Sequence, residues 1–410
     1  MGGKLSYITK NGSWLIALQV VASLSGLLSS VVLTRYLTTD EFGIYRFLLT
    51  IVAIATLATL PGLNSAIIRG VSRYGTLALQ PLMRTKLHWS AGGSGLLLIV
   101  FGYYWWQGSN DIAIGLLILA ATLPLLERYA IYIPYRKGSE DFTTTSHDLM
   151  VTKLVQVTAV IAAATITNDA LVTFAALLVS KILTNRLYFF WRKPITEPYS
   201  DATTEAITFG KKLTATQILI TLSNQIDKLC IWYFTTAATL AYYAVAFLIP
   251  STLQGFIGFL PQLALPRFAK QNWRQQNVMR TYVRRISMLA LILSGLYVLY
   301  IVTVPHIFHW LFPTYQTALG AAMILGSMIV LQPIRLLGEQ MFIAQERSLP
   351  LVVISVIEIT VFVSSFIALY MIYGDNLTML ALAFPLKILA AICVQIIYAG
   401  ITLRHNLQKS

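Results

Sequence analysis

The sequence is poor in charge, and acidic side chains are its scarcest charged type. Only 11% of its 410 residues are Asp, Glu, Lys or Arg, and 16 residues are acidic, whereas soluble domains carry roughly 25% charged residues. A soluble chain of this length could not cover its surface with so few charges. Apolar residues make up 57% of the chain and the mean hydropathy is +0.69. We therefore predict an all-α integral membrane protein.

Groups that would carry chemistry are also scarce. The cysteines, Cys230 and Cys393, lie inside apolar runs, which argues against a disulfide framework. The sequence has no phosphate-binding G-x-x-x-x-G-K-[ST] loop, and His306 and His309 have no acidic or cysteine neighbour that would complete a metal site. The loops are too short to hold a cluster of catalytic groups. We expect neither an enzyme nor a bound cofactor or metal ion.

Apolar runs of about 20 residues, the length that crosses a bilayer as a helix, occur about twelve times. They lie near residues 12–34, 44–66, 87–107, 111–133, 147–167, 169–191, 207–234, 238–262, 285–305, 317–343, 349–373 and 376–402. The longest polar stretch follows the sixth run. We therefore predict an N-terminal six-helix lobe (1–194), a cytoplasmic linker (195–206) and a C-terminal six-helix lobe (207–410).

Lys and Arg concentrate in every second predicted loop. The loops after the second and sixth runs include Arg69, Arg73, Lys86 and Arg192, whereas the loops near 107–111 and 305–317 contain no Lys or Arg. Because basic loops stay in the cytoplasm, both termini are predicted to be cytoplasmic. The net charge of +14 then lies on the face that meets anionic lipid headgroups. This favours membrane lipids as partners and argues against nucleic acid.

The two predicted lobes share local sequence. Tyr36-Leu37-Thr38-Thr39 parallels Tyr233-Phe234-Thr235-Thr236, and Ile68-Arg69 parallels Pro266-Arg267 at a nearly equal offset. Two repeats in the same orientation are a plan found in transporters, whose halves rock about a central site to give alternating access. The repeat therefore favours a transporter.

Polar residues recur at three- and four-residue steps along two predicted helices, so each set shares one helix face. On the seventh helix these are Thr214, Gln217, Thr221, Asn224 and Lys228, with Asp227 beside them. On the first helix they are Gln19, Ser23, Gly26 and Ser30. Such faces either line a wet cavity or pack helices together. We favour the cavity for the seventh helix and leave both alternatives open for the first.

Three cations lie in the outer part of the predicted protein, against the positive-inside trend: Arg35, Arg46 and Lys228. An anionic ligand would explain them, and so would local pairing. Pairing with Asp40 or Glu41 is the stronger explanation for Arg35, and pairing with Asp227 is an alternative for Lys228. The candidate substrate-binding residues are Arg46, Lys228, Arg35, Asn224, Gln217 and Thr221.

Other ionisable residues fall deeper in the predicted spans. Glu358 and Lys387 could form a buried structural pair. Alternatively, Asp227 or Glu358 binds H⁺ or Na⁺ and couples its gradient to transport, because a buried carboxylate holds a proton at higher pH than an exposed one. Asp227, Glu358 and Lys387 are therefore the ion-coupling candidates. Arg335, near the inner end of its helix, is expected to be an interfacial anchor.

Several short motifs carry a family resemblance. They are Arg35-Tyr-Leu-Thr-Thr-Asp-Glu-Phe-Gly-Ile-Tyr45, Gly62-Leu-Asn-Ser-Ala-Ile-Ile-Arg69, Tyr135-Arg-Lys-Gly138, Ile226-Asp-Lys-Leu229, Tyr242-Tyr-Ala-Val-Ala246 and Leu265-Pro-Arg-Phe-Ala-Lys270. Together they resemble the polysaccharide flippases of the MOP exporter superfamily, the O-antigen or Wzx-type flippases. The resemblance covers essentially the whole chain.

This resemblance implies a function, a location and an arrangement of helices. Members of the family move undecaprenyl-pyrophosphate-linked oligosaccharides from the inner to the outer leaflet of the bacterial plasma membrane, for O-antigen, capsule or exopolysaccharide synthesis. A polysaccharide polymerase is an expected partner. The first, second, seventh and eighth helices would line a cationic central cleft.

Two other classes compete with the flippase. An ion-coupled multidrug or small-solute antiporter of the same superfold should have an acidic, aromatic-lined pocket, whereas the outer charges here are mostly basic. A non-transporting scaffold for glycan assembly would not need Lys181 and Lys387 in the middle of the membrane. The G-x-x-x-D-R-x-G-R-[KR] loop of major-facilitator transporters is missing between the second and third runs.

Overall fold

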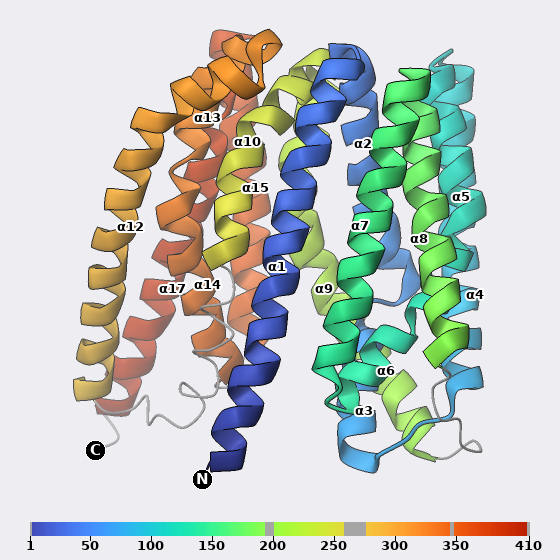
Figure 1. Ribbon diagram of the computed structural model, residues 1–410. Coiled ribbons are helices and arrows are strands. Elements are labelled where there is room, and N and C mark those ends of the chain that lie inside the picture. Colours follow the sequence, from blue (N-terminus) through green and yellow to red (C-terminus); the bar gives the residue numbers. More distant parts are fainter. Residues whose placement is uncertain (1, 193–200, 258–275, 345–347, 408–410) are drawn as a thin grey trace. The chain divides into compact units, whose positions relative to one another are not determined.

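The computed structural model describes residues 2–192, 201–257, 276–344 and 348–407, and these residues form helices and no strands (Figure 1). The all-α prediction is therefore confirmed. Contacts divide the chain into two compact units, Met1–Gln225 and Ile226–Ser410. Residues 195–200 of the predicted linker lie outside the described residues, and residues 201–206 begin a long helix. The predicted lobe boundary stays a prediction.

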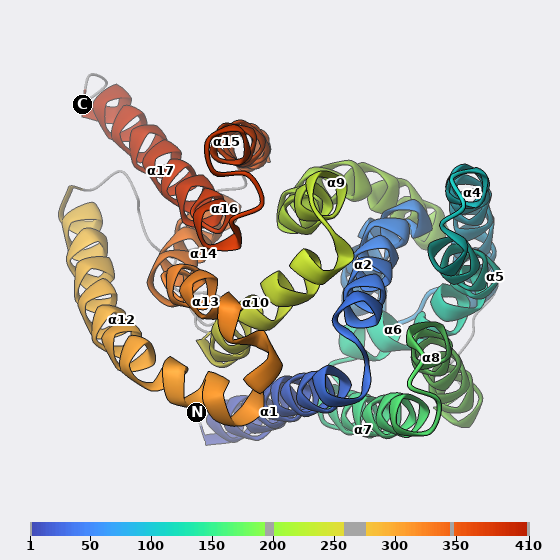
Figure 2. The same ribbon diagram turned by 90° about the horizontal axis from the view of Figure 1, so that it is seen from above.

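The first unit consists mainly of long helices that pack side by side. Its elements are α1 (Gly2–Tyr36), α2 (Thr39–Ala55), η1 (Thr56–Thr59), α3 (Gly62–Tyr74), α4 (Leu79–Trp106), α5 (Asn110–Ala130), α6 (Tyr132–Gly138), α7 (Phe142–Thr167), α8 (Ala170–Arg192) and the larger part of α9 (Asp201–Phe234). Helix α1 packs against α7, α7 against α8, and α5 against both α4 and α8. Figure 2 shows α7 beside α8 when this unit is viewed from above.

The second unit has more interrupted helices. It contains the end of α9 followed by α10 (Ala237–Ile257), α12 (Gln276–Leu311), η2 (Pro313–Ala318), α13 (Leu319–Leu325), α14 (Met328–Ala344), α15 (Ser348–Tyr373), α16 (Leu377–Leu380) and α17 (Ala383–Leu407). Helix α17 packs against α14 and α15, and α10 packs against α13 and α14.

Most of these helices suit a membrane. Among the described residues, nine helices are long and apolar enough to cross one, and the bent pair Pro313–Leu325 and Met328–Ile343 makes a tenth if it is a single span. The predicted runs 87–107 and 207–234 lie on α4 and α9, which are long helices outside this set. The chain is therefore a multi-pass membrane protein, while the count of twelve and the cytoplasmic termini stay predictions.

The second predicted span, 44–66, is wrong as a single helix. Helix α2 begins with a capping box, in which Thr38 Oγ1 accepts from the Glu41 backbone N–H and the Glu41 carboxylate accepts from the Thr38 N–H. Its continuation η1 ends at Thr59, and the next residue, Leu60, has a left-handed backbone (φ 61°) and precedes Pro61. Proline has no N–H to continue the helical ladder and disfavours an α conformation at the residue before it. The chain therefore turns and starts α3.

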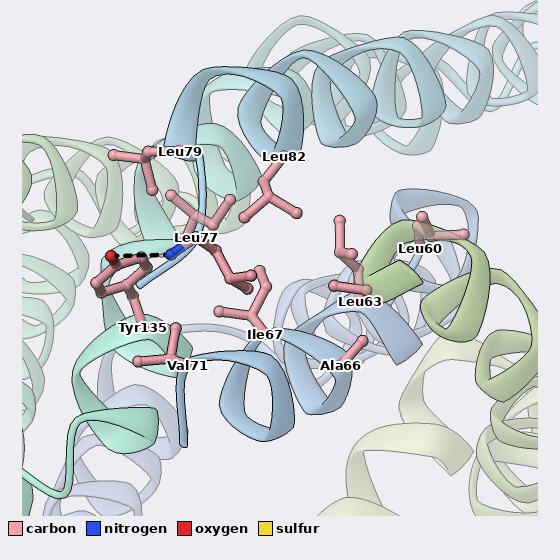
Figure 3. Packing of buried hydrophobic residues seen from close by; sticks show 11 residues of the cluster. Leu60, Leu63, Ala66, Ile67, Val71, Leu77, Leu79, Leu82 and Tyr135 are labelled. Carbon is pink, nitrogen blue, oxygen red and sulfur yellow. Dashed lines mark hydrogen bonds between the residues drawn. The ribbon is translucent and has the colours of Figure 1, made fainter. Parts of the chain in front are cut away.

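Helix α3 is amphipathic and packs on its apolar face. That face joins a buried cluster (Figure 3) of Leu60, Leu63, Ala66, Ile67, Val71, Leu77, Leu79, Leu82, Ile131, Tyr135 and Ala206. The Tyr135 hydroxyl accepts a hydrogen bond from the Leu77 N–H (3.3 Å). The other face carries Ser65, Arg69 and Arg73, which are exposed. One apolar face and one polar face are typical of a helix that lies on a surface.

The start of α9 is fastened to α3 and to the α3–α4 connection. Thr214 Oγ1 accepts from the Gly62 N–H (3.1 Å), and Thr203 Oγ1 accepts from the Ala78 N–H (3.1 Å). A Cβ on Gly62 would collide with the Gly210 carbonyl oxygen and with Thr214. Glycine is therefore required for this close backbone approach. Thr214, which we predicted on the polar face of the seventh helix, serves this junction.

The break between α13 and α14 receives hydrogen bonds from side chains of α12. The Tyr300 and Tyr297 hydroxyls on α12 donate to the carbonyls of Ala322 and Met323 (3.0 Å each). In a membrane, backbone polar groups freed by a helix break must find partners within the protein. The Tyr297 hydroxyl meets that need at Met323, and the Tyr300 hydroxyl adds a second donor at Ala322, whose carbonyl also accepts from the Gly326 N–H (2.9 Å). Both contacts support the bend of 42° within the predicted span 317–343.

The Gly62 junction can be tested by adding a single methyl group. Gly62→Ala should lower the free energy of unfolding by about 1–3 kcal/mol, because the packed backbones cannot move apart without strain. The matched control is Gly92→Ala on α4, where a Cβ meets nothing within 4 Å; it should be neutral or stabilising by up to about 1 kcal/mol. Denaturation of the detergent-purified protein measures both. Equal stability of the two variants would contradict the close approach.

Candidate functional site

Asp227 is the centre of a buried polar group in the second unit. It lies on α9, its side chain is buried, and it accepts a hydrogen bond from the Tyr243 hydroxyl on α10 (2.8 Å). Its neighbour Lys228 approaches with its ammonium 3.4 Å from a carboxylate oxygen. The local pairing of Lys228 with Asp227, which the sequence left open, is therefore present. A quarter of the Lys228 side chain stays exposed.

Lys387 brings a second ammonium to the same buried group. It lies on α17, is 4% exposed, and is placed over the rings of Phe384 (4.4 Å) and Phe362 (5.2 Å). An ammonium over an aromatic face is attracted by the ring quadrupole. Lys387 also interacts electrostatically with Asp227 and Glu358. The structure thus gathers the predicted ion-coupling candidates in one unit.

Glu358 has a strong partner that the sequence analysis missed. Arg335 on α14 donates to Glu358 on α15 from both Nε and Nη2, the second bond being 3.0 Å long, and Arg335 Nη2 also lies 3.0 Å from Glu339. Gln395 on α17 donates to the Arg335 backbone carbonyl (3.0 Å). Arg335 is 4% exposed, so the prediction that it anchors the interface is wrong. Lys387 is not the sole partner of Glu358, because Arg335 binds it in a bidentate manner.

In the first unit, Arg46 meets the polar face of α1. Its Nη2 donates to Ser30 Oγ (3.0 Å), and its guanidinium lies 5.0 Å from the centre of the Phe42 ring. Arg46 is half-buried. Sequence spacing placed Ser30 on a polar face and Arg46 at the outer end of the next helix, but it did not predict their contact. Arg35, at the end of α1, is exposed.

The candidate residues of α9 differ in their surroundings. Gln217 and Thr221 are half-buried, and Asn224 is exposed. The side-chain carbonyl oxygen of Gln217 is buried and accepts no hydrogen bond from the described residues. A buried acceptor of this kind is costly unless a partner supplies the missing bond. Gln217 is therefore suited to accept from a hydroxyl of a ligand.

Two buried ion pairs of the first unit were not predicted. Lys86 on α4, fully buried, lies 2.7 Å from Glu127 on α5. Arg192 on α8 donates to Asp148 on α7 from Nη2 (2.8 Å) and Nε (3.1 Å). The prediction that Lys86 and Arg192 belong to basic loops is wrong, because Lys86 lies within α4 and Arg192 ends α8. Each lies within two residues of the end of a predicted span. That position was the one indication in the sequence that the helix, and not a loop, contains the charged residue.

Comparison with known proteins gives one family and one fold. Residues 8–272 match the family of polysaccharide biosynthesis proteins. Among solved structures, an inward-facing multidrug resistance MATE family transporter of the MOP superfamily shares 14% identity over 97% of this chain and 96% of its own, with a TM-score of 0.61. MATE in complex with MaD5 shares 11% over 98% and 96%, with a TM-score of 0.67.

A third structure has the same fold. It is a MOP superfamily transporter from Pyrococcus furiosus Vc1 (DSM3638), described by a reverse polarity of its binding pocket that suggests a different function, with 12% identity over 97% and 96% of the two chains and a TM-score of 0.58. At such identities the likeness shows the fold alone. No curated protein matches the sequence significantly. The chain therefore has the fold of MOP superfamily transporters. One of the motifs that carried the family resemblance, Leu265–Lys270, lies outside the described residues.

We expect Arg335 and its carboxylate partner Glu358 to contribute unequally to stability. Arg335→Gln should cost about 3–5 kcal/mol, because it leaves Glu358 and Glu339 without their shared cation. Glu358→Gln should cost less, about 1.5–3 kcal/mol, because Arg335 keeps Glu339. Chemical denaturation in detergent measures both, with the exposed Arg186→Gln as a control that should change stability by less than about 0.5 kcal/mol. Equal losses in the two buried variants would refute this assignment.

Proposed function

The chain belongs to the polysaccharide biosynthesis protein family, and we propose that it is a flippase for undecaprenyl-pyrophosphate-linked oligosaccharide. It would carry this lipid from the inner to the outer leaflet of the bacterial plasma membrane by alternating access, for O-antigen, capsule or exopolysaccharide synthesis. The family match over residues 8–272 is the observation that carries the proposal. A transporter fold on a polysaccharide biosynthesis protein supports the same conclusion.

The physical task requires polar groups within the membrane. A pyrophosphate and a glycan cannot cross about 30 Å of hydrocarbon unaided. We propose that Arg46, Lys228 and Arg35 attract the pyrophosphate, and that Gln217, Thr221 and Asn224 replace the hydration of the sugars. The buried acceptor on Gln217 and the partial exposure of Lys228 support these roles. The polyprenyl tail can stay in lipid.

Coupling to an ion gradient is assigned to the Asp227 group rather than to Glu358. Glu358 is held by both Nε and Nη2 of Arg335, so an ion that binds Glu358 would have to break this bidentate contact. Asp227 has a tyrosine hydroxyl and two ammonium groups as neighbours. Sodium would have to displace these ammonium groups, whereas a proton only has to move among them. We therefore favour H⁺ over Na⁺, with Lys387 as the second proton-holding group.

The membrane environment and partners follow from this role. We expect contacts with membrane lipids and a complex with a polysaccharide polymerase that receives the flipped product, and no nucleic acid partner. A second candidate function is an ion-coupled multidrug antiporter, which is supported by the likeness to multidrug MATE structures.

A proteoliposome assay separates the two candidates. Labelled undecaprenyl-pyrophosphate oligosaccharide is placed in one leaflet, and its appearance in the other is followed with and without a pH or Na⁺ gradient. Protein-dependent crossing supports the flippase. Absence of crossing with several glycans, together with exchange of a soluble cationic drug, favours the antiporter.

Loss of either proposed pyrophosphate contact should slow flipping. Arg46→Ala and Lys228→Ala should each reduce the initial rate by about tenfold or more, because each removes a charge-assisted contact with the headgroup. Arg84→Ala, which removes an exposed cation of α4, is the matched control and should leave the rate unchanged. Full activity of both test variants in membranes with normal insertion would remove these residues from the mechanism.

The assignment of coupling predicts a difference between two carboxylates. Asp227→Asn should abolish the acceleration of flipping by a pH gradient, because it removes the acidic member of the proton-exchanging group. Glu358→Gln should keep the acceleration while lowering stability. Flipping with and without the gradient, normalised to folded protein, gives the answer. The reverse pattern would move the coupling site to Glu358.

A further inference from the structure

A small pocket of the first unit brings two arginines together. It is a shallow depression, open to solvent, between α3 and the start of α9, and its enclosed volume is about 10 Å³. Its floor consists of small residues, Ala66, Gly70, Ala202 and Ala206, and its walls carry Arg69, Arg73, Tyr74, Glu205 and Phe209. The short side chains of the floor leave the two arginines at the rim of this shallow depression, where a ligand at the surface can reach them.

The two guanidinium groups are held by aromatic rings. Arg69 lies 4.5 Å from the centre of the Phe209 ring, and Arg73 lies 5.3 Å from that of Tyr74. Stacking on a ring face leaves the N–H edge of a guanidinium available for an oxygen ligand. Both residues are exposed, and among the described residues neither has a carboxylate within ion-pair distance. Like charges four residues apart on one helix also repel each other, and an anion between them would relieve that repulsion.

One carboxylate shares the pocket and is engaged by its own donor. The Tyr74 hydroxyl donates to Glu205 (2.8 Å), and this hydrogen bond raises the pKa of Tyr74. The tyrosine thus keeps its proton and remains the hydrogen-bond donor of Glu205. The pocket therefore combines two cations, one restrained carboxylate and two aromatic faces.

We propose that this pocket binds the phosphate of an anionic phospholipid headgroup. Arginine suits phosphate because its planar N–H fork matches two oxygens. The rings of Tyr74 and Phe209 offer apolar contact for the glycerol and the first acyl carbons, which a free phosphate lacks. The predicted position of Arg69 and Arg73 in a cytoplasmic loop agrees with the negative charge of the inner leaflet. This site is independent of the proposed substrate and its path.

The test titrates the detergent-purified full chain with phosphatidylglycerol and counts bound lipid by native mass spectrometry. The double variant Arg69→Gln/Arg73→Gln should weaken phosphatidylglycerol binding by about tenfold or more, without changing the weak binding of zwitterionic phosphatidylcholine. The matched control is Lys211→Gln/Lys212→Gln, which removes two exposed cations from the same end of α9 outside the pocket. It should change binding by less than about twofold. Equal losses in both doubles would reduce the effect to general surface charge and overturn the site.

A third variant has the opposite expected sign. Glu205→Gln should tighten phosphatidylglycerol binding severalfold, because it removes the only carboxylate of the pocket lining and keeps an acceptor for Tyr74. Unchanged binding with a lowered melting temperature would show that Glu205 is the natural counter-ion of the arginines and that no lipid phosphate is required. Inorganic pyrophosphate is added as a competitor. If it displaces the lipid at comparable concentration, the pocket recognises a soluble phosphate or a substrate headgroup, and the phospholipid assignment is wrong.

Discussion

A charge buried within a membrane protein needs an opposite charge or a set of hydrogen bonds beside it, because hydrocarbon offers neither water nor counter-ions. The described residues with nearly inaccessible charges obey this constraint without exception. They are Lys86, Asp148, Asp227, Arg335, Glu358 and Lys387. Each faces an opposite charge from the same unit. Three of these ion pairs each join two different helices of one unit.

The ion pairs therefore decide which helices become neighbours. Lys86 and Glu127 join α4 to α5, Arg192 and Asp148 join α8 to α7, and Arg335 and Glu358 join α14 to α15. In lipid there is little hydrophobic drive between helices, so packing and polar contacts must supply the specificity. The Asp227 group differs because its carboxylate is surrounded by separate single donors, a tyrosine hydroxyl and two ammonium groups, instead of a bidentate guanidinium. We take this difference to separate a candidate working site from a purely structural ion pair.

Sequence reasoning found the helices and most polar faces, since apolar length and three- to four-residue spacing are local properties. It failed where the deciding contact is distant in the chain or depends on backbone conformation. Lys86 was assigned to a loop because its partner Glu127 lies 41 residues away. The run 44–66 was treated as one helix because hydropathy does not register the left-handed turn at Leu60. Gln217 and Asn224 were placed on one face, yet their different burial depends on neighbours that spacing cannot reveal.

The break between α13 and α14 also constrains how this protein can change over generations. A side chain at Gly326 would collide with the rings of Tyr300 and Tyr297, whose hydroxyls bind the carbonyls of Ala322 and Met323. Replacing the glycine would expel the rings and remove the hydroxyl donors of both carbonyls, while replacing a tyrosine by a smaller residue would make room for a larger residue at 326. Positions 297, 300 and 326 are therefore coupled, and in homologous sequences we expect them to be substituted together or all retained.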